Sequence, residues 1–221
     1  MRQAFGMIEL IFAIVIIGIA LLAIPPVLMQ TTSSIEEIVK QEAIFQGYRT
    51  IGVIHTYKWD DRSVIGDDTN YSHILDVTNG DDELNRTSSS SIVRVGNFNS
   101  NRRVFFNTTR YASTTLGMEA GETDKDDFDD FNGNTDTITT TPGEFILTFD
   151  INQKVFYIAD TADYNTTTLN ITIPVTPAAA STNIKMVELN ITQDNKSIIV
   201  LRSFSCNIAE PIPGLLSKEV N

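Results

Sequence analysis

The sequence has few of the residues that catalysis, disulfide bonding or nucleic-acid binding requires. Its single cysteine, Cys206, cannot form a disulfide within the chain. Its two histidines, His55 and His73, do not sit in a metal-binding spacing, and the chain contains no GxSxG, P-loop or CxxC motif. Lysine and arginine number 16 against 28 aspartates and glutamates, which gives a net charge of -12. Phosphate backbones are bound by clustered basic side chains, so we expect no nucleic-acid-binding protein. Because the catalytic motifs are absent, we also expect no enzyme.

The sequence does contain a long apolar run near its N-terminus, from Ala4 to Met29, whose only charged side chain is Glu9. At about 1.5 Å per helical residue, about 25 residues cross a hydrocarbon core of about 30 Å. The run therefore predicts a transmembrane helix. A carboxylate inside such a helix costs about 2.5–3.5 kcal/mol on insertion scales, so Glu9 requires a cationic partner or a position near the membrane surface.

The residues before Glu9 form a short basic leader followed by a large apolar residue. The leader reads Arg2-Gln3-Ala4, Phe5 comes next, and Glu9 follows four residues later inside the apolar run. This order resembles the class III signal of the prepilin family, in which a proline some distance past the glutamate, here Pro26, is also typical. The resemblance implies that prepilin peptidase cuts between Ala4 and Phe5 and methylates Phe5, and that Glu9 is an assembly contact.

The residue before the expected cut departs from the family pattern. The family usually has glycine at this position, where this sequence has Ala4. A cut after Gly6 would restore the glycine, but it would leave Glu9 only two residues beyond Met7. We therefore expect the cut to fall before Phe5.

Two other kinds of N-terminal segment contain an apolar run. A secretory signal peptide has an apolar core of about 7–15 residues and a small-x-small cleavage site, whereas this run is longer and continues into Pro25-Pro26-Val27. A plain signal anchor explains the length and the cytoplasmic side of Arg2. It gives no reason for Glu9, or for Phe5 directly after so short a leader, and the prepilin-like interpretation explains both.

Beyond the prolines, residues 30–59 predict that the helix continues with one apolar face. Charged residues separate five apolar positions near helical spacing, namely Ile35, Ile38, Val39, Phe45 and Tyr48. Pro25 and Pro26 lack amide hydrogens, which predicts a kink or local melting of the helix at these two residues. The helix is expected to end near Trp59, which we expect to be a core residue.

The remaining residues, 60–221, predict one globular antiparallel β domain. Strands are expected at 92–95, 103–106, 144–149, 154–159, 169–175, 184–192 and 197–204. Hairpin turns are expected at Ile151-Asn152-Gln153 and at Gln193-Asp194-Asn195-Lys196. The predicted organisation is a leader (1–4), an apolar helix (5–29), an amphipathic half-helix (30–59) and the β domain. The fold class is α+β, with a long N-terminal helix packed on an antiparallel sheet.

One acidic run in this domain suggests a metal site. Its carboxylates could supply the hard oxygen ligands that calcium prefers, and they come from Asp124, Asp126, Asp127, Asp129 and Asp130. The spacing does not match an EF-hand loop, so the alternative is a solvated acidic loop fixed to the core by Phe128 and Phe131. No other cofactor is expected. The run, together with Leu201-Arg202-Ser203-Phe204 and Asn207-Ile208, also resembles minor pilins of mannose-sensitive haemagglutinin type.

These features together predict a pilin-like structural subunit, a minor pilin or pseudopilin, of a type IV pilus, competence or type II secretion filament. The resemblance implies prepilin peptidase, other pilin subunits and the inner membrane as partners. It also implies a cytoplasmic leader, an extracytoplasmic C-terminal domain, and an assembled form in a filament or at the cell surface. The alternative is a single-pass anchored binding domain that never polymerises, and removal of the leader distinguishes the two.

Overall fold

The computed structural model describes residues 6–64, 72–95, 103–143, 146–164, 166–168 and 170–209. The chain divides into two compact units, residues 1–43 and residues 44–221. The leader and the expected cleavage residues, Ala4 and Phe5, lie outside the described residues. Within the described part, a single long helix and a four-stranded antiparallel sheet account for the regular structure apart from three short 3₁₀ turns. This agrees with the α+β prediction.

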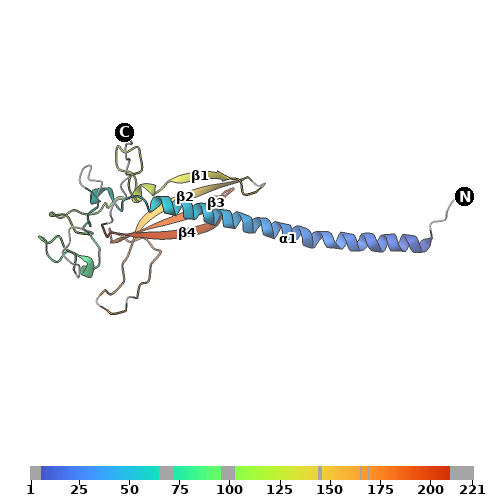
Figure 1. The fold of residues 1–221 in the computed structure, drawn as a ribbon, viewed down its shortest axis with the longest axis horizontal. Coiled ribbons are helices and arrows are strands. Elements are labelled where there is room, and N and C mark those ends of the chain that lie inside the picture. The colour runs from blue at the N-terminus through green and yellow to red at the C-terminus, as the bar shows by residue number, and fades with distance from the viewer. Residues whose placement is uncertain are drawn as a thin grey trace, which may run out of the picture. The chain divides into compact units, whose positions relative to one another are not determined.

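The helix α1 spans Met7–Ile54 and continues through Pro25 and Pro26 without interruption (Figure 1). The local melting expected at the prolines is therefore wrong, and the kink remains a prediction. Each proline removes only its own backbone donor, while the ladder of hydrogen bonds continues on both sides. The hydroxyl of Thr31 also donates to the carbonyl of Val27 at 2.9 Å, which adds a bond just after the prolines.

The helix ends at Ile54, earlier than the sequence predicts. The next residues form tighter turns, with the amide of Thr56 donating to the carbonyl of Val53 at 2.9 Å. Asp60 then takes an extended conformation, with φ -162°, and its carboxylate accepts from the amide of Arg62. This arrangement is an N-cap for the short turn η1 (Asp61–Ser63), so a separate element begins after the helix has ended.

The sheet has the order β1-β2-β3-β4, and each neighbouring pair is antiparallel (Figure 1). Its strands are β1 (Thr135–Thr140), β2 (Leu147–Ile158), β3 (Ile184–Gln193) and β4 (Lys196–Cys206). The predicted hairpin between β3 and β4 is confirmed. Asp194 and Asn195 form its two-residue turn with φ values of 50° and 63°, the left-handed pair that a type I′ turn requires.

The hairpin predicted at Ile151-Asn152-Gln153 is wrong, because β2 runs straight through these residues. Ile151 pairs with Ile191 of β3, and Asn152 pairs with Thr135 of β1. The sequence analysis missed β1 because its residues are mostly threonine. Its threonine hydroxyls bond to β2, for example from Thr137 to the carboxylate of Asp150 at 2.6 Å, so polar cross-strand pairs stabilise this edge.

Three other predicted strands are wrong. The 92–95 and 103–106 segments contribute only isolated bridges, Arg86 with Arg94 and Ile74 with Phe105. The described part of the 169–175 segment, residues 170–175, has no strand. Phe105 shares a buried cluster with Ile74, whereas Ile171, Ile173 and Val175 are exposed.

The inner face of the sheet packs on the last turns of α1 (Figure 1). Val187, Leu189 and Ile191 of β3 are completely buried. A side chain added at Gly47 would lie under 3.0 Å from those of Ile191 and Leu201, so glycine is what allows this close approach. The predicted apolar face of the helix is largely wrong, because Phe45 and Tyr48 are exposed and so are Ile35 and Ile38. The buried residues in this part of the helix are instead Ala43, Gln46, Gly47 and Ile54.

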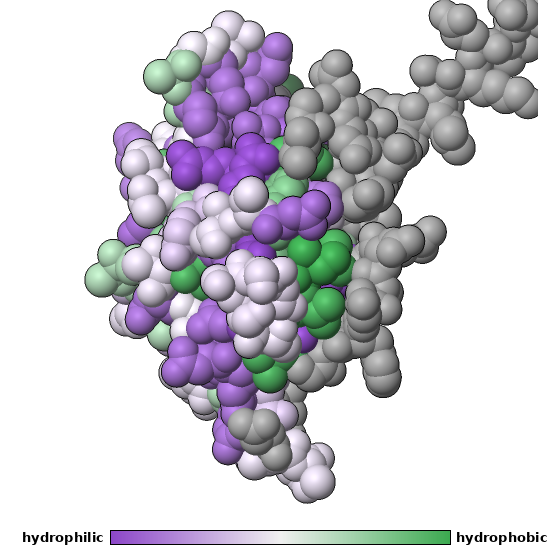
Figure 2. All heavy atoms as spheres, turned by 90° about the vertical axis from the view of Figure 1, so that its left-hand side faces the viewer, coloured by the Kyte–Doolittle hydropathy of each residue, from purple (hydrophilic) through white to green (hydrophobic). Residues whose placement is uncertain are grey.

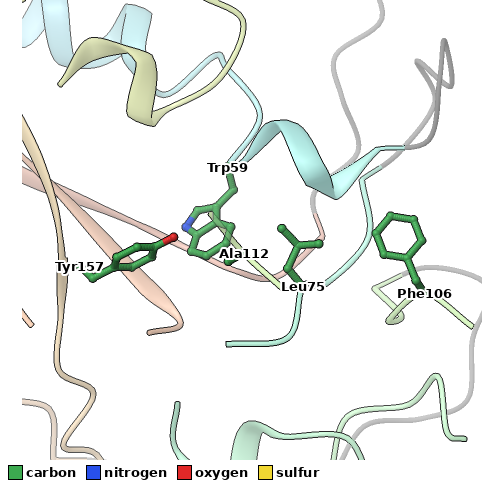
Figure 3. Packing of buried hydrophobic residues seen from close by; sticks show 5 residues of the cluster. All are labelled: Trp59, Leu75, Phe106, Ala112 and Tyr157. Atoms are coloured by element: carbon green, nitrogen blue, oxygen red, sulfur yellow. The ribbon is translucent and has the colours of Figure 1, made fainter. Parts of the chain in front are cut away.

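A second cluster lies beyond the helix end and consists of Trp59, Leu75, Phe106, Ala112 and Tyr157. Figure 3 shows Trp59 between Tyr157 on one side and Leu75 on the other. The indole of Trp59 donates to the carbonyl of Ser205 at 3.2 Å. The expectation that Trp59 is a core residue is confirmed, and its backbone position brings the adjacent Asp60 into the interior.

Candidate functional site

The N-terminal part of α1 exposes all of its described large apolar side chains. Between Met7 and Met29 these side chains are between 50% and 81% exposed. By length and composition this helix could cross a membrane, and it is one such helix among the described residues. Glu9 lies in its first turn and is exposed. The segment therefore combines uncovered apolar surface with a single carboxylate.

The outer unit, residues 44–221, has a different surface. Figure 2 shows one of its faces, where side chains of hydrophilic and intermediate hydropathy cover most of the described area and hydrophobic side chains form a smaller patch. A limited amount of exposed apolar surface is normal, since roughly 55–60% of the accessible surface of a folded protein comes from apolar atoms. The continuous exposed apolar surface between Met7 and Met29 therefore has no counterpart on this face.

The interior of the outer unit contains a buried lysine, Lys185, which is 0% exposed. Its ammonium group donates to the carbonyl of Trp59 at 2.7 Å, to the carboxylate of Asp60 at 3.0 Å and to the carboxylate of Asp129. It also lies 4.3 Å from the centre of the Trp59 ring. All three donors of the ammonium are satisfied, as a buried charge requires.

The charge of Lys185 is held in place by the carboxylates around it. Burial alone would lower the pKa of Lys185, but the charges of Asp60, Asp129 and Asp127 outweigh burial and raise this pKa. The lysine therefore stays charged in the folded protein. Its counter-charges come from residues far apart in the chain, so the ion cluster fixes the acidic run and the end of α1 to β3.

Two further carboxylates of the acidic run accept backbone hydrogen bonds. Asp127 accepts from the amides of Asp61 at 2.7 Å and Asp129 at 2.8 Å. Asp130 accepts from the amides of Asp126 at 2.7 Å and Asp127 at 3.1 Å. Burial and the charge of Asp129 raise the pKa of Asp127 to about 8. Burial also raises the pKa of Asp129, against the opposing effect of Lys185.

The five predicted calcium ligands therefore do not form one site. Asp127 and Asp129 are used by backbone amides and by Lys185, while Asp124 and Asp126 are exposed. Asp126 pairs with Lys58 at 2.9 Å. The alternative of a solvated acidic loop is also wrong in part, because Asp127, Asp129 and Asp130 are 0% exposed. The prediction that Phe128 and Phe131 anchor the loop is confirmed, since both are buried.

Sequence reasoning missed the buried role of Lys185, although a signal was present. Lys185 lies two residues before Val187 in a strand whose alternate residues, Leu189 and Ile191, are completely buried. Side chains two apart in a strand share a face, so a lysine in this position has to point into the core. Such a lysine requires carboxylates, and the acidic run is the nearest rich source of them.

One further group of carboxylates lies beside the acidic run. Glu119, Glu122 and Asp130 bring one oxygen each within 4.8 Å of one another. Burial, a side-chain hydrogen bond with Glu122 and the nearby charges raise the pKa of Glu119 to about 7. Only Asp130 of this group belongs to the predicted calcium ligand set.

Comparisons of the chain with models of known protein families, with curated proteins and with solved structures find no match. The function is therefore inferred from the residues of this chain and from their chemistry.

Proposed function

We propose that this protein is a pilin-like structural subunit, a minor pilin or pseudopilin, of a type IV pilus, competence or type II secretion filament. Its leader, residues 1–4, is removed by prepilin peptidase, which also methylates Phe5. The apolar part of α1 holds the subunit in the inner membrane before assembly and lies among the helices of other subunits afterwards. The outer unit is extracytoplasmic in both states.

One observation carries this proposal. The apolar stretch between Met7 and Met29 is exposed along its whole described length and contains a single carboxylate, Glu9, in its first turn. A membrane anchor needs the apolar surface but gains nothing from the carboxylate, which costs about 2.5–3.5 kcal/mol to insert. A helix that packs among identical helices can use the carboxylate, provided that a cation meets it there.

The N-terminus supplies such a cation after cleavage. The amine of Phe5 is positively charged near neutral pH, and four residues separate it from Glu9, about one helical turn. In low dielectric a charge pair of this kind is strong, and removing one partner leaves the other unpaired at a cost of about 3–5 kcal/mol. The amine of a neighbouring subunit can meet Glu9 in the same way.

The proposal is tested first by the mass of the mature protein. Mass spectrometry of the protein extracted from membranes is expected to show a chain that lacks Met1 to Ala4 and carries one methyl group. A chain beginning at Met7 would contradict the register of the cut. An intact Met1 would instead support the anchored binding domain that does not polymerise.

The second test is the co-purification of other pilin subunits with a Glu9→Leu variant. This variant is expected to insert and to be cleaved, because leucine removes the insertion penalty, but to recover far fewer partner subunits at matched membrane levels. Glu37→Leu is the matched control, since Glu37 is an exposed glutamate of the same helix outside the apolar stretch. Equal recovery with Glu9→Leu and wild type would contradict an assembly role for Glu9.

A further inference from the structure

The loop before the acidic run brings three carboxylates together. The amide of Glu119 donates to the carboxylate of Glu122 at 3.0 Å, and the amide of Glu122 donates back to the carbonyl of Glu119 at 3.1 Å. This closed turn places both glutamates beside Asp130 of the short turn η3 (Asp129–Phe131), with one oxygen of each residue within 4.8 Å of the others. The group therefore combines two elements that the backbone holds in place.

Asp130 is the buried member of the group, with 0% exposure. Its Oδ2 atom accepts from the amides of Asp126 and Asp127, which fixes the orientation of the carboxylate. Its Oδ1 atom is buried without a hydrogen bond among the described residues, and so is Oε2 of Glu119. A buried acceptor without a partner costs about 1–3 kcal/mol, and more when it is charged. Both atoms belong to residues of the carboxylate group, so a cation held among these carboxylates would give each of them a partner.

Two of the nearby lysines are paired with other carboxylates, and a third lies over an aromatic ring. Lys185 pairs with Asp60 and Asp129, and Lys58 pairs with Asp61 at 2.5 Å and with Asp126 at 2.9 Å. The ammonium of Lys125 lies over the ring of Phe131, 4.6 Å from its centre. A further cation would therefore balance the charge of the group without breaking these pairs.

We propose that Glu119, Glu122 and Asp130 bind one calcium ion. Calcium takes six to eight oxygen ligands at about 2.3–2.6 Å, so two ligands on opposite sides of the ion can be about 4.6–5.2 Å apart. The three carboxylate oxygens lie within this limit. Zinc is a poorer match because it prefers nitrogen and sulfur ligands. Water completes the coordination at the two partly exposed glutamates.

The site differs from the calcium site that the sequence suggests, since only Asp130 is common to the two sets. Its expected effect is to bind the Glu119–Glu122 turn to η3. The acidic run is in turn fixed to the helix end, through the amide of Phe128 and the carbonyl of Lys58 at 2.8 Å. Calcium would therefore stabilise the outer unit as a whole, and this role does not depend on the proposed filament function.

The test is a calcium titration of the full-length protein in detergent, after treatment with a chelator. Salt is kept at about 150 mM, where the Debye length is about 8 Å, to screen diffuse attraction to the acidic surface. Calorimetry is expected to show one calcium per chain, and thermal unfolding followed by Trp59 fluorescence is expected to shift upward with calcium. The Glu122→Gln variant is expected to bind calcium about tenfold more weakly or worse, because affinity follows the number of charged ligands.

Asp124→Asn is the matched control, because Asp124 is an exposed carboxylate of the same loop region outside the proposed site. Its calcium affinity is expected to equal that of the wild type. Glu119→Gln provides a second variant if Glu122→Gln unfolds. The absence of saturable binding at millimolar calcium would overturn the proposal. So would glutamate variants that both bind calcium as tightly as the wild type. Magnesium that binds as tightly as calcium would also overturn it, in favour of unspecific attraction of cations.

Discussion

The apolar stretch of α1 and the outer unit differ in the exposure of their apolar and acidic side chains. Between Met7 and Met29 the large apolar side chains are at least half exposed, and the one carboxylate, Glu9, is exposed with them. In the outer unit, Ile151 and Leu189 are completely buried, and the carboxylate of Asp129 is buried beside a lysine. The outer unit buries these side chains within the chain, whereas the apolar stretch leaves them exposed to its surroundings.

The difference shows where each region obtains its stability. Fully burying a large aliphatic side chain yields about 1.5–3 kcal/mol, and the outer unit gains this from its own sheet. The apolar stretch does not gain it from the described residues, because its large side chains stay at least half exposed. The same contrast holds for charge, since Asp60 and Asp129 have Lys185 as an internal partner, while we propose that Glu9 meets an N-terminal amine.

The largest effect is expected from removing the internal partner. Lys185→Met keeps the volume of the side chain but leaves the buried carboxylates of Asp60 and Asp129 without their cation, at a cost of about 3–5 kcal/mol. Urea unfolding of the full-length protein in detergent measures this, because Trp59 is the single tryptophan and lies in the affected core.

Lys196→Met is the matched control for this prediction, because Lys196 is exposed at the β3–β4 turn. Its effect is expected to stay within about 0.5 kcal/mol, as for most surface substitutions. A Lys185→Met protein as stable as this control would show that the outer unit does not depend on internal pairing. The proposed difference in charge pairing between the outer unit and the apolar stretch would then be wrong.

The pH dependence of unfolding sharpens the same contrast. The pKa of Asp127 is raised from 3.8 to about 8 in the folded state, so the folded protein holds more protons than the unfolded chain between these two pKa values. An acid with a raised pKa contributes stability below its unfolded pKa and loses it as the pH rises through the folded value. The melting temperature in the presence of a chelator is therefore expected to fall between about pH 5 and pH 8.

Repulsion within a chain of net charge -12 would also lower stability as the pH rises. The Asp127→Asn variant separates the two causes, because it removes one titrating group and should flatten the slope whatever its absolute stability. A melting temperature that rises over this range would contradict the prediction. An unchanged slope in the variant would show that Asp127 does not cause the fall, and it would leave general repulsion and the raised pKa of Glu119 as the causes.

The sequence predicts best those elements whose pattern is set by neighbouring residues. A long apolar run predicts a helix of membrane-spanning length, and α1 is such a helix. The β3–β4 hairpin follows from alternating apolar residues on both sides of Asp194-Asn195. In both cases the physical constraint acts within a few residues along the chain.

Elements that depend on distant partners were not predicted. Ile151 to Gln153 look like a turn, but Gln153 is a buried strand residue whose side-chain amide donates to Asp136 of β1 at 2.6 Å. Lys185 looks like a solvated strand residue, but its partner Asp60 is 125 positions away in the sequence. A polar side chain is acceptable in a core only when another element satisfies it, and residue spacing alone does not contain this information.

A smaller effect is expected from filling the contact between α1 and the sheet. Gly47→Leu would force side-chain atoms against Ile191 and Leu201, and overpacking of this kind costs about 1–3 kcal/mol. Gly18→Leu is the matched change in the apolar stretch, where no neighbouring atom lies within 4 Å of an added carbon. It is expected to leave the Trp59 unfolding transition unchanged. A shift of that transition by Gly18→Leu would contradict the separation of the two regions.

The smallest effect is expected at Gly52, in the last turn of α1. This glycine is exposed, and an added carbon would meet no atom within 4 Å. Glycine inside a helix costs up to about 1 kcal/mol relative to alanine, and less near a helix end, so Gly52→Ala is expected to stabilise the outer unit by about 0.5 kcal/mol. The urea midpoint from Trp59 fluorescence measures the change. A loss of stability would show that another molecule covers the surface around Gly52. The outer unit would then also depend on its surroundings, as we propose for the apolar stretch.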